Sequence, residues 1–168
     1  MFVDETSINL TYCRRYGRAP QGRRVDQVVP LHGGPNVTLI AARTPNGPGV
    51  LLSGNGVVNR DVFAAYLDQV LGSTLVPGDV VVPDNLSVHK VDGSEQVVKK
   101  YGARLRYLPP HFPDFNPIEW AFSNLKTGLR KAQARTRDVL EEAICTVAER
   151  LSGHDAKNWF DQCGYHVH

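Results

Sequence analysis

Three acidic residues of this chain have the surroundings expected of metal-binding carboxylates. Asp4 and Asp84 each follow a short apolar run, and Glu119 comes at a helix start after a proline-rich turn. Carboxylates placed at the ends of strands and helices can share divalent cations, which prefer oxygen ligands. A pair of such cations is a common device for cutting and joining phosphodiesters. The three acids therefore predict a two-metal site that acts on nucleic acid.

Two of these acids also have a plainer structural explanation. An Asp directly after a strand is most often a turn former or a helix cap, and this would account for Asp84. Asn116 and Glu119 fit an Asn-x-x-Glu capping box, with Pro117 in the first position of the helix. The sequence pattern alone leaves both explanations open.

The first acid has a competitor in the next residue, Glu5. Neighbours on a strand point to opposite faces, so only one of Asp4 and Glu5 can join Asp84. We favour Asp4, because Val3 would share the other face with Glu5. Asp4 is expected to end the first strand.

Apolar runs and turn signals predict the elements that hold these acids. Strands are expected at 1–7, 36–43, 50–54, 79–84 and 104–108, with at most one short further strand near 25–30. Helices are expected at 60–71, 89–101, 117–131 and 136–152.

This order of elements predicts an α/β protein with a mixed five-stranded sheet flanked by helices. The hairpin in the first half must run antiparallel, and strands joined by helices in the second half must run parallel. The order is that of the ribonuclease H-like fold. If the first and fourth strands are neighbours, Asp4 and Asp84 meet at one edge of the sheet.

The composition is that of an ordinary soluble domain. The 168 residues are 42% hydrophobic and 21% charged, with a net charge of +2, and we expect a single domain over 1–168. The three cysteines are widely spaced and form no C-x-x-C pair, which favours reduced thiols in the cytoplasm. No apolar run approaches the length of a membrane span, so we expect no membrane partner.

Each of the three acids lies in a distinctive motif. The first is in VDETS at 3–7, the second in DN at 84–85 followed by His89, and the third ends LPPHFPDFNPIE at 108–119. Between the second and third acids lie 34 residues, and the chain closes with NWFDQCGY. These motifs together resemble the catalytic domain of DDE transposases, in the bacterial insertion-sequence branch of the mariner superfamily, with Phe112 where the family usually has Ser.

The resemblance implies DNA strand cleavage and strand transfer on a ribonuclease H-like fold. It makes Asp4, Asp84 and Glu119 the catalytic residues and the ligands of two Mg²⁺ or Mn²⁺ ions. Candidates for a supporting role behind these ligands, or for DNA contact, are Asn85, His89 and Asn116. The implied partners are transposon ends, target DNA and a second copy of the chain in a homodimer. The implied location is the bacterial cytoplasm, on the nucleoid when active.

The chain departs from the family pattern at its start. Family members carry helix-turn-helix DNA-binding segments ahead of the first acid, and this sequence begins three residues before it. We therefore expect a truncated copy, or the downstream half of a split or frameshifted product whose upstream half carries the helix-turn-helix region.

Two basic segments are candidates for contact with DNA. One face of the helix from Pro117 is expected to carry Glu119, Ser123, Lys126 and Arg130. A basic stripe leading from a metal ligand would suit a phosphate backbone, whereas the plainer explanation is an ordinary solvated helix face. The second segment follows the first strand and contains Arg14, Arg15, Arg18, Arg23 and Arg24.

Two alternative functions remain open at this point. A ribonuclease H-like nuclease without strand transfer would use a similar set of carboxylates. An inactive remnant that binds DNA or a partner transposase would keep the fold without the chemistry. The presence of all three acids argues against decay of the site, whereas the missing front end argues for a loss of autonomous activity. Only the 108–119 run argues against the nuclease.

Overall fold

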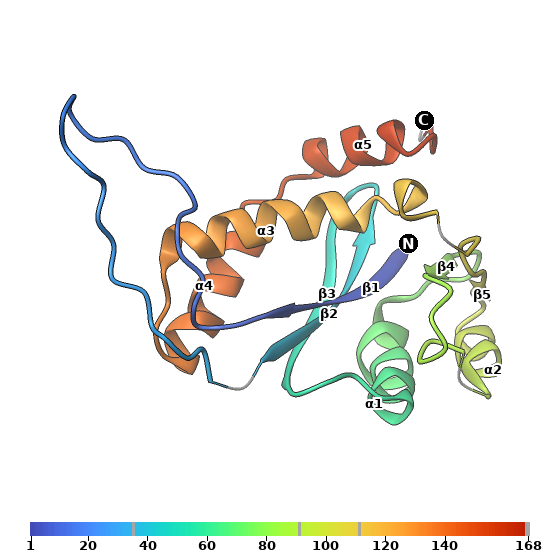
Figure 1. Cartoon of the computed structure of the whole chain (residues 1–168). Coiled ribbons are helices and arrows are strands. Elements are labelled where there is room, and N and C mark those ends of the chain that lie inside the picture. Colours follow the sequence, from blue (N-terminus) through green and yellow to red (C-terminus); the bar gives the residue numbers. More distant parts are fainter. Residues whose placement is uncertain (35, 91, 111, 167–168) are drawn as a thin grey trace.

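A computed structural model describes residues 1–34, 36–90, 92–110 and 112–166. Its centre is a five-stranded sheet with the strand order β3-β2-β1-β4-β5 (Figure 1). The strands are β1 Phe2–Ile8, β2 Val37–Thr44, β3 Gly47–Asn55, β4 Val80–Pro83 and β5 Arg104–Leu105. β1, β2 and β3 pair antiparallel, while β1, β4 and β5 pair parallel. The expected mixed five-stranded α/β sheet is confirmed.

Helices cover both faces of the sheet (Figure 1). They are α1 Arg60–Ala65, the π-helix η1 Tyr66–Leu71, the 3₁₀ turn η2 Gly72–Thr74, α2 Ser94–Lys100, the 3₁₀ turn η3 Pro113–Phe115, α3 Ile118–Ala132, α4 Arg137–Glu149 and α5 Gly153–Gln162. Two apolar clusters result, one against α3, α4 and α5 and one against α1, η1 and α2. Alternation along β1 divides its side chains between them, with Phe2 in the first cluster and Val3 in the second.

The helices differ from the expected ones in three places. The helix expected at 89–101 begins only at Ser94, because its N-cap Gly93 has a left-handed φ of 92° and the residues before it form a turn. The helix expected at 136–152 forms as α4 and ends at Glu149, and a further helix that was not expected, α5, starts at Gly153 behind a capping box of Ser152 and Asp155. No strand forms at 25–30, which agrees with the expectation of at most one there. The helix expected at 60–71 becomes π-helical from Tyr66.

The position of β1 sets the geometry of the acids. The expectation that Asp4 ends its strand was wrong, because β1 continues to Ile8 and Asp4 lies inside it, opposite Ala41 of β2. β1 and β4 are neighbours that pair in parallel, and Val3 lies opposite Pro83 in the register. The next residue of each chain segment is an acid, so Asp4 and Asp84 lie side by side.

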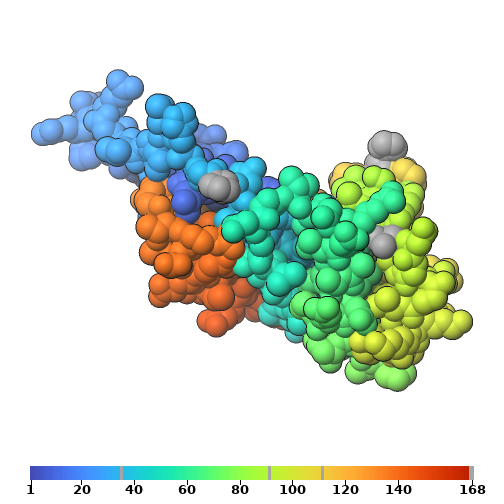
Figure 2. Space-filling view, turned by 90° about the horizontal axis from the view of Figure 1, so that it is seen from below, coloured from blue at the N-terminus to red at the C-terminus, as the bar shows by residue number. Residues whose placement is uncertain are grey.

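The connection between β1 and β2 forms an extended arm, residues 13–34, that runs away from the sheet (Figure 1). Figure 2 shows the same segment projecting beyond the body of the molecule. Its base is held by Arg135 of the α3–α4 connection, whose Nη1 donates to the carbonyls of Leu10 and Tyr12 at 2.9 Å each. In the part of the chain that the structure describes, no helix is long and apolar enough to cross a membrane.

Candidate active site

The three predicted acids line one cavity of about 330 Å³. Asp4 comes from β1, Asp84 directly follows β4, and Glu119 lies in the first turn of α3. Polar and apolar residues complete the wall: Asn85, Leu86, Leu108, Pro109, Pro110, Phe112, Pro113 and Asn116. The structure thus brings together residues that are up to 115 positions apart in the sequence.

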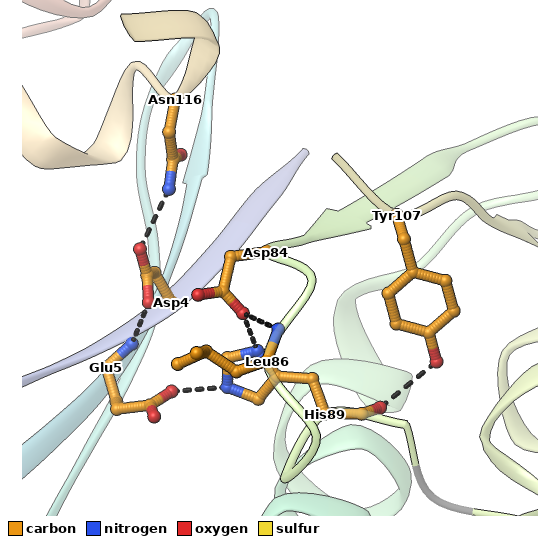
Figure 3. Close-up of polar contacts among 7 residues, drawn as sticks. All are labelled: Asp4, Glu5, Asp84, Leu86, His89, Tyr107 and Asn116. Carbon is orange, nitrogen blue, oxygen red and sulfur yellow. Dashed lines mark hydrogen bonds and ion pairs between the residues drawn. The ribbon is translucent and has the colours of Figure 1, made fainter. Parts of the chain in front are cut away.

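Asp4 is buried, with 6% of its surface exposed. Its Oδ1 accepts a hydrogen bond from the backbone N–H of Glu5 at 2.8 Å, and its Oδ2 accepts one from Nδ2 of Asn116 at 2.8 Å (Figure 3). Burial, reinforced by the nearby charges of Asp84, Glu119 and Glu5, raises the pKa of Asp4 to about 7, although the Glu5 N–H opposes the rise. Among the residues that the structure describes, no positively charged side chain forms an ion pair with this carboxylate.

Asn116 does not cap α3, contrary to the capping-box explanation. Pro117 occupies the cap position and makes no side-chain hydrogen bond to the start of the helix. The Asn116 side chain points instead to Asp4, while its backbone carbonyl accepts from the N–H of Glu119 at 3.2 Å. Glu119 is an exposed residue at the cavity wall. Asn116 and Glu119 therefore do not form a capping box, because the Asn116 side chain is bonded to Asp4 and not to the start of the helix.

Asp84 both forms a turn with Leu86 and lines the cavity. Its Oδ1 accepts from the backbone N–H of Leu86 at 2.9 Å and also contacts Nδ1 of His89 (Figure 3). Burial raises the pKa of Asp84, but the hydrogen bonds from His89 and Leu86 outweigh it and leave the pKa below its usual value. The turn-forming explanation and the functional one are thus compatible.

His89 is fully buried between two carboxylates. Nδ1 contacts Oδ1 of Asp84, and Nε2 contacts Oε2 of Glu5. Burial lowers the pKa of His89, but these two acids outweigh burial and raise it to about 9. Sequence reasoning placed Glu5 on the opposite face from Asp4, which is correct, and missed that Glu5 reaches Asp84 through His89.

The oxygen-rich cavity fits a hard divalent cation. Three carboxylates line it, and Asp4 carries a burial cost that a cation would relieve. In addition, Oδ1 of Asn116 is buried and has no hydrogen-bond partner among the described residues. Across residues 1–34, 36–90, 92–110 and 112–166, however, no three carboxylate, His or Cys side chains are close enough together to hold one ion. The acids share a cavity without forming a finished coordination sphere.

The predicted DNA contacts separate into two groups. Arg14 and Arg15 of the arm meet Arg130 of α3 at a second cavity of about 710 Å³, and the Arg130 guanidinium lies 5.1 Å from the centre of the Tyr12 ring. Lys126 is half-buried on α3, next to Thr127 of that cavity's wall. The remaining arginines, Arg18, Arg23 and Arg24, are exposed along the arm. Asn85 lines the acidic cavity.

Comparisons with known proteins agree with this geometry. Residues 1–141 match the family described as DDE superfamily endonuclease. Three solved structures of Mos1 transposase share the fold at 12% identity: a strand transfer complex (TM-score 0.75), a paired-end complex with the left transposon end (0.74) and a mariner paired-end complex with Mn (0.73). Each alignment covers 96% of this chain and 51% of the other.

The chain therefore spans about half the length of these transposases. No curated protein matches it. The ribonuclease H-like fold expected from the order of elements is confirmed by these structures. The family match covers most of the chain, including all three acids of the cavity. The chain belongs to the DDE superfamily endonucleases.

Proposed function

We propose that this chain is the catalytic domain of a transposase that cleaves DNA and transfers the cut strand to a new site. The observation that carries the proposal is the convergence of Asp4, Asp84 and Glu119 on one cavity of a ribonuclease H-like sheet. The family match and the resemblance of the 108–119 run to transposases of the bacterial insertion-sequence branch support it.

Asp4, Asp84 and Glu119 would hold two Mg²⁺ or Mn²⁺ ions. When bound, such a pair supplies an activated water or 3′-hydroxyl and neutralises charge at the phosphorus. Asn116 orients Asp4 from the α3 side, and His89 orients Asp84 from the α1 side. Because Asp4 is buried with a raised pKa, it binds a proton near neutral pH that must leave before Asp4 can be a ligand.

The substrates would be transposon ends and target DNA. Arg14, Arg15 and Arg130 meet where the arm joins α3, and they offer phosphate contacts of the kind that position a duplex without reading its sequence. Lys126 would extend this basic surface toward Glu119. A helix-turn-helix segment, carried upstream or by a separate chain, would read the transposon ends, and the active complex would be a homodimer in the bacterial cytoplasm.

The proposal is tested first by metal binding. Mn²⁺ should raise the melting temperature of the chain, in free-energy terms by RT ln(1 + [Mn²⁺]/Kd). Asp84→Asn should remove most of this rise, whereas Glu149→Gln, at an exposed carboxylate at the end of α4, should leave it unchanged. An equal response in Asp84→Asn and in the unmodified chain would contradict the assignment of the cavity.

Joining assays then separate transposase from nuclease. With Mn²⁺ and a pre-cut oligonucleotide bearing a free 3′-hydroxyl, a transposase domain should produce joined strands. Hydrolysis without joining would indicate a nuclease, and metal binding without either product would indicate an inactive remnant. Asp84→Asn and Glu119→Gln serve as negative controls for both products.

A further inference from the structure

Glu5 is an acid inside the sheet with no role in the cavity. It neighbours Asp4 on β1 but points to the opposite face (Figure 3). That face of the sheet carries the apolar cluster to which Val3 and Phe63 belong. Only 19% of its side-chain surface is exposed. A carboxylate in such a place is costly unless it is paired. The partner of the Glu5 side chain among the described residues is His89, so this contact indicates what Glu5 does.

His89 transmits the position of Glu5 to Asp84. Its ring has a carboxylate oxygen on each nitrogen, Oε2 of Glu5 on Nε2 and Oδ1 of Asp84 on Nδ1. The ring packs on Phe63 with centroids 4.3 Å apart, and the His89 carbonyl accepts from Oη of Tyr107 at 3.0 Å. With both its ring and its backbone held, the imidazole has one orientation in which Nδ1 faces Asp84.

The contact with His89 engages one oxygen of Asp84 and leaves the other free to bind a ligand. Oδ1 already accepts from the N–H of Leu86 at 2.9 Å and from His89. Asp84 also lines the acidic cavity, so Oδ2 is the atom left for a ligand there. Asp4 is held separately, by Asn116 on the other side of β1.

We propose that Glu5 is a positioning residue that fixes the Asp84 carboxylate through His89, so that Oδ2 is presented to a divalent cation. The inference rests on the proposed function, in which Asp84 is a metal ligand. Glu5 itself touches neither the cavity nor a substrate. Partners behind metal ligands commonly contribute about 10–100-fold to metal affinity, and this sets the effect to be measured.

The test compares Mn²⁺ dissociation constants of full-length variants by electron paramagnetic resonance of free Mn²⁺. Glu5→Leu removes the acceptor for Nε2 of His89 and should weaken Mn²⁺ binding about 10-fold or more. Glu5→Gln keeps a carbonyl oxygen at the same reach and should stay within about threefold of the unmodified chain. Glu141→Leu, a half-buried acid of α4 bonded to Ser53 and Arg137, is the matched control and should bind normally.

Folding of each variant is checked by circular dichroism and by its unfolding midpoint without metal. If Glu5→Leu does not fold, Glu5→Thr replaces it, because threonine suits a strand but is too short to reach His89. A dissociation constant for the folded variant equal to that of the unmodified chain would overturn the inference. So would a loss in Glu5→Gln as large as in Glu5→Leu, because position and hydrogen bonding would then not be the cause.

Failure of the underlying function gives a different pattern. If Asp84→Asn binds Mn²⁺ as tightly as the unmodified chain, or the unmodified chain binds none, the metal site itself is wrong and the inference falls with it. If Asp84→Asn loses binding while Glu5→Leu keeps it, the metal site stands and only the positioning role of Glu5 is refuted.

Discussion

Replacing a proposed metal ligand should make the metal-free chain more stable. Asp4 is 6% exposed, and among the described residues no Lys, Arg or His side chain forms an ion pair with it. Asparagine has the same shape and no charge, and its Oδ1 can still accept from the N–H of Glu5. The amide of Asn116 can turn over so that its own oxygen accepts from the new Nδ2. Asp4→Asn should thus remove a burial cost while keeping both hydrogen bonds.

The size of the gain follows from the pKa of Asp4, which rises from 3.8 to about 7 on folding, chiefly through burial. Between these values the folded chain binds the proton and the unfolded chain does not, so stability falls as pH rises through this window. At about 1.4 kcal/mol per pKa unit, the cost is about 4 kcal/mol above pH 7 and less than half of that at pH 5. Both figures are upper bounds on the gain from Asp4→Asn.

Urea unfolding in EDTA measures the unfolding free energies of Asp4→Asn and of the unmodified chain at pH 8 and pH 5. The fluorescence of Trp120 and Trp159 reports the unfolding. Asp4→Asn should be more stable than the unmodified chain, by a larger margin at pH 8. Asp84→Asn should instead destabilise the chain. Burial raises the pKa of Asp84, but hydrogen bonds from His89 and Leu86 outweigh burial and hold the pKa below its usual value, so the charged form stabilises the fold. A destabilised Asp4→Asn at pH 8, or a gain that is the same at both pH values, would refute the reasoning.

Three further outcomes are expected. Mn²⁺ affinity, measured calorimetrically, should increase from pH 6 to pH 8 as Asp4 loses the proton that its raised pKa retains, and a flat profile would argue against Asp4 as a ligand. Asn116→Ala should leave a buried carboxylate oxygen unpaired and lower the unfolding free energy by about 1–3 kcal/mol, which an unchanged urea midpoint would contradict. Lys126→Ala should reduce the slope of log K for duplex DNA against log salt by about 0.9, equally for any sequence, and a loss confined to one sequence would speak for base reading instead.

Local patterns predicted the strands that meet at the cavity, because apolar runs and turn signals depend on nearby residues. The sequence predicted the adjacency of Asp4 and Asp84 only on the condition that the first and fourth strands are neighbours, and the pairing of β1 with β4 meets that condition. The contact of Glu5 with His89 could not be predicted in this way, because 84 positions separate the two residues. It also depends on a turn at 84–90, where the pattern favoured a helix from 89 that Gly93 prevents.

Competition for one side chain explains a second difference. Asn116 has the right type and spacing for a helix cap, and nothing local excludes that role. A buried carboxylate more than a hundred residues earlier takes the amide instead. A local sequence pattern shows that Asn116 is able to cap a helix. It does not show that a buried carboxylate lies nearby, and leaving that carboxylate without a hydrogen bond would cost more free energy than leaving the helix uncapped.

The order of the two acids in β1 carries information that their composition does not. Asp4 and Glu5 face opposite layers of the molecule, one toward Asn116 and the other toward His89. Exchanging them would preserve the charge, the atoms and the hydrophobic pattern of the strand. It would nevertheless put the longer acid in the space sized for the shorter one and leave the shorter acid unable to span the distance to the imidazole. Exchanging the two acids would thus leave the composition unchanged and still break both contacts, the one with Asn116 and the one with His89.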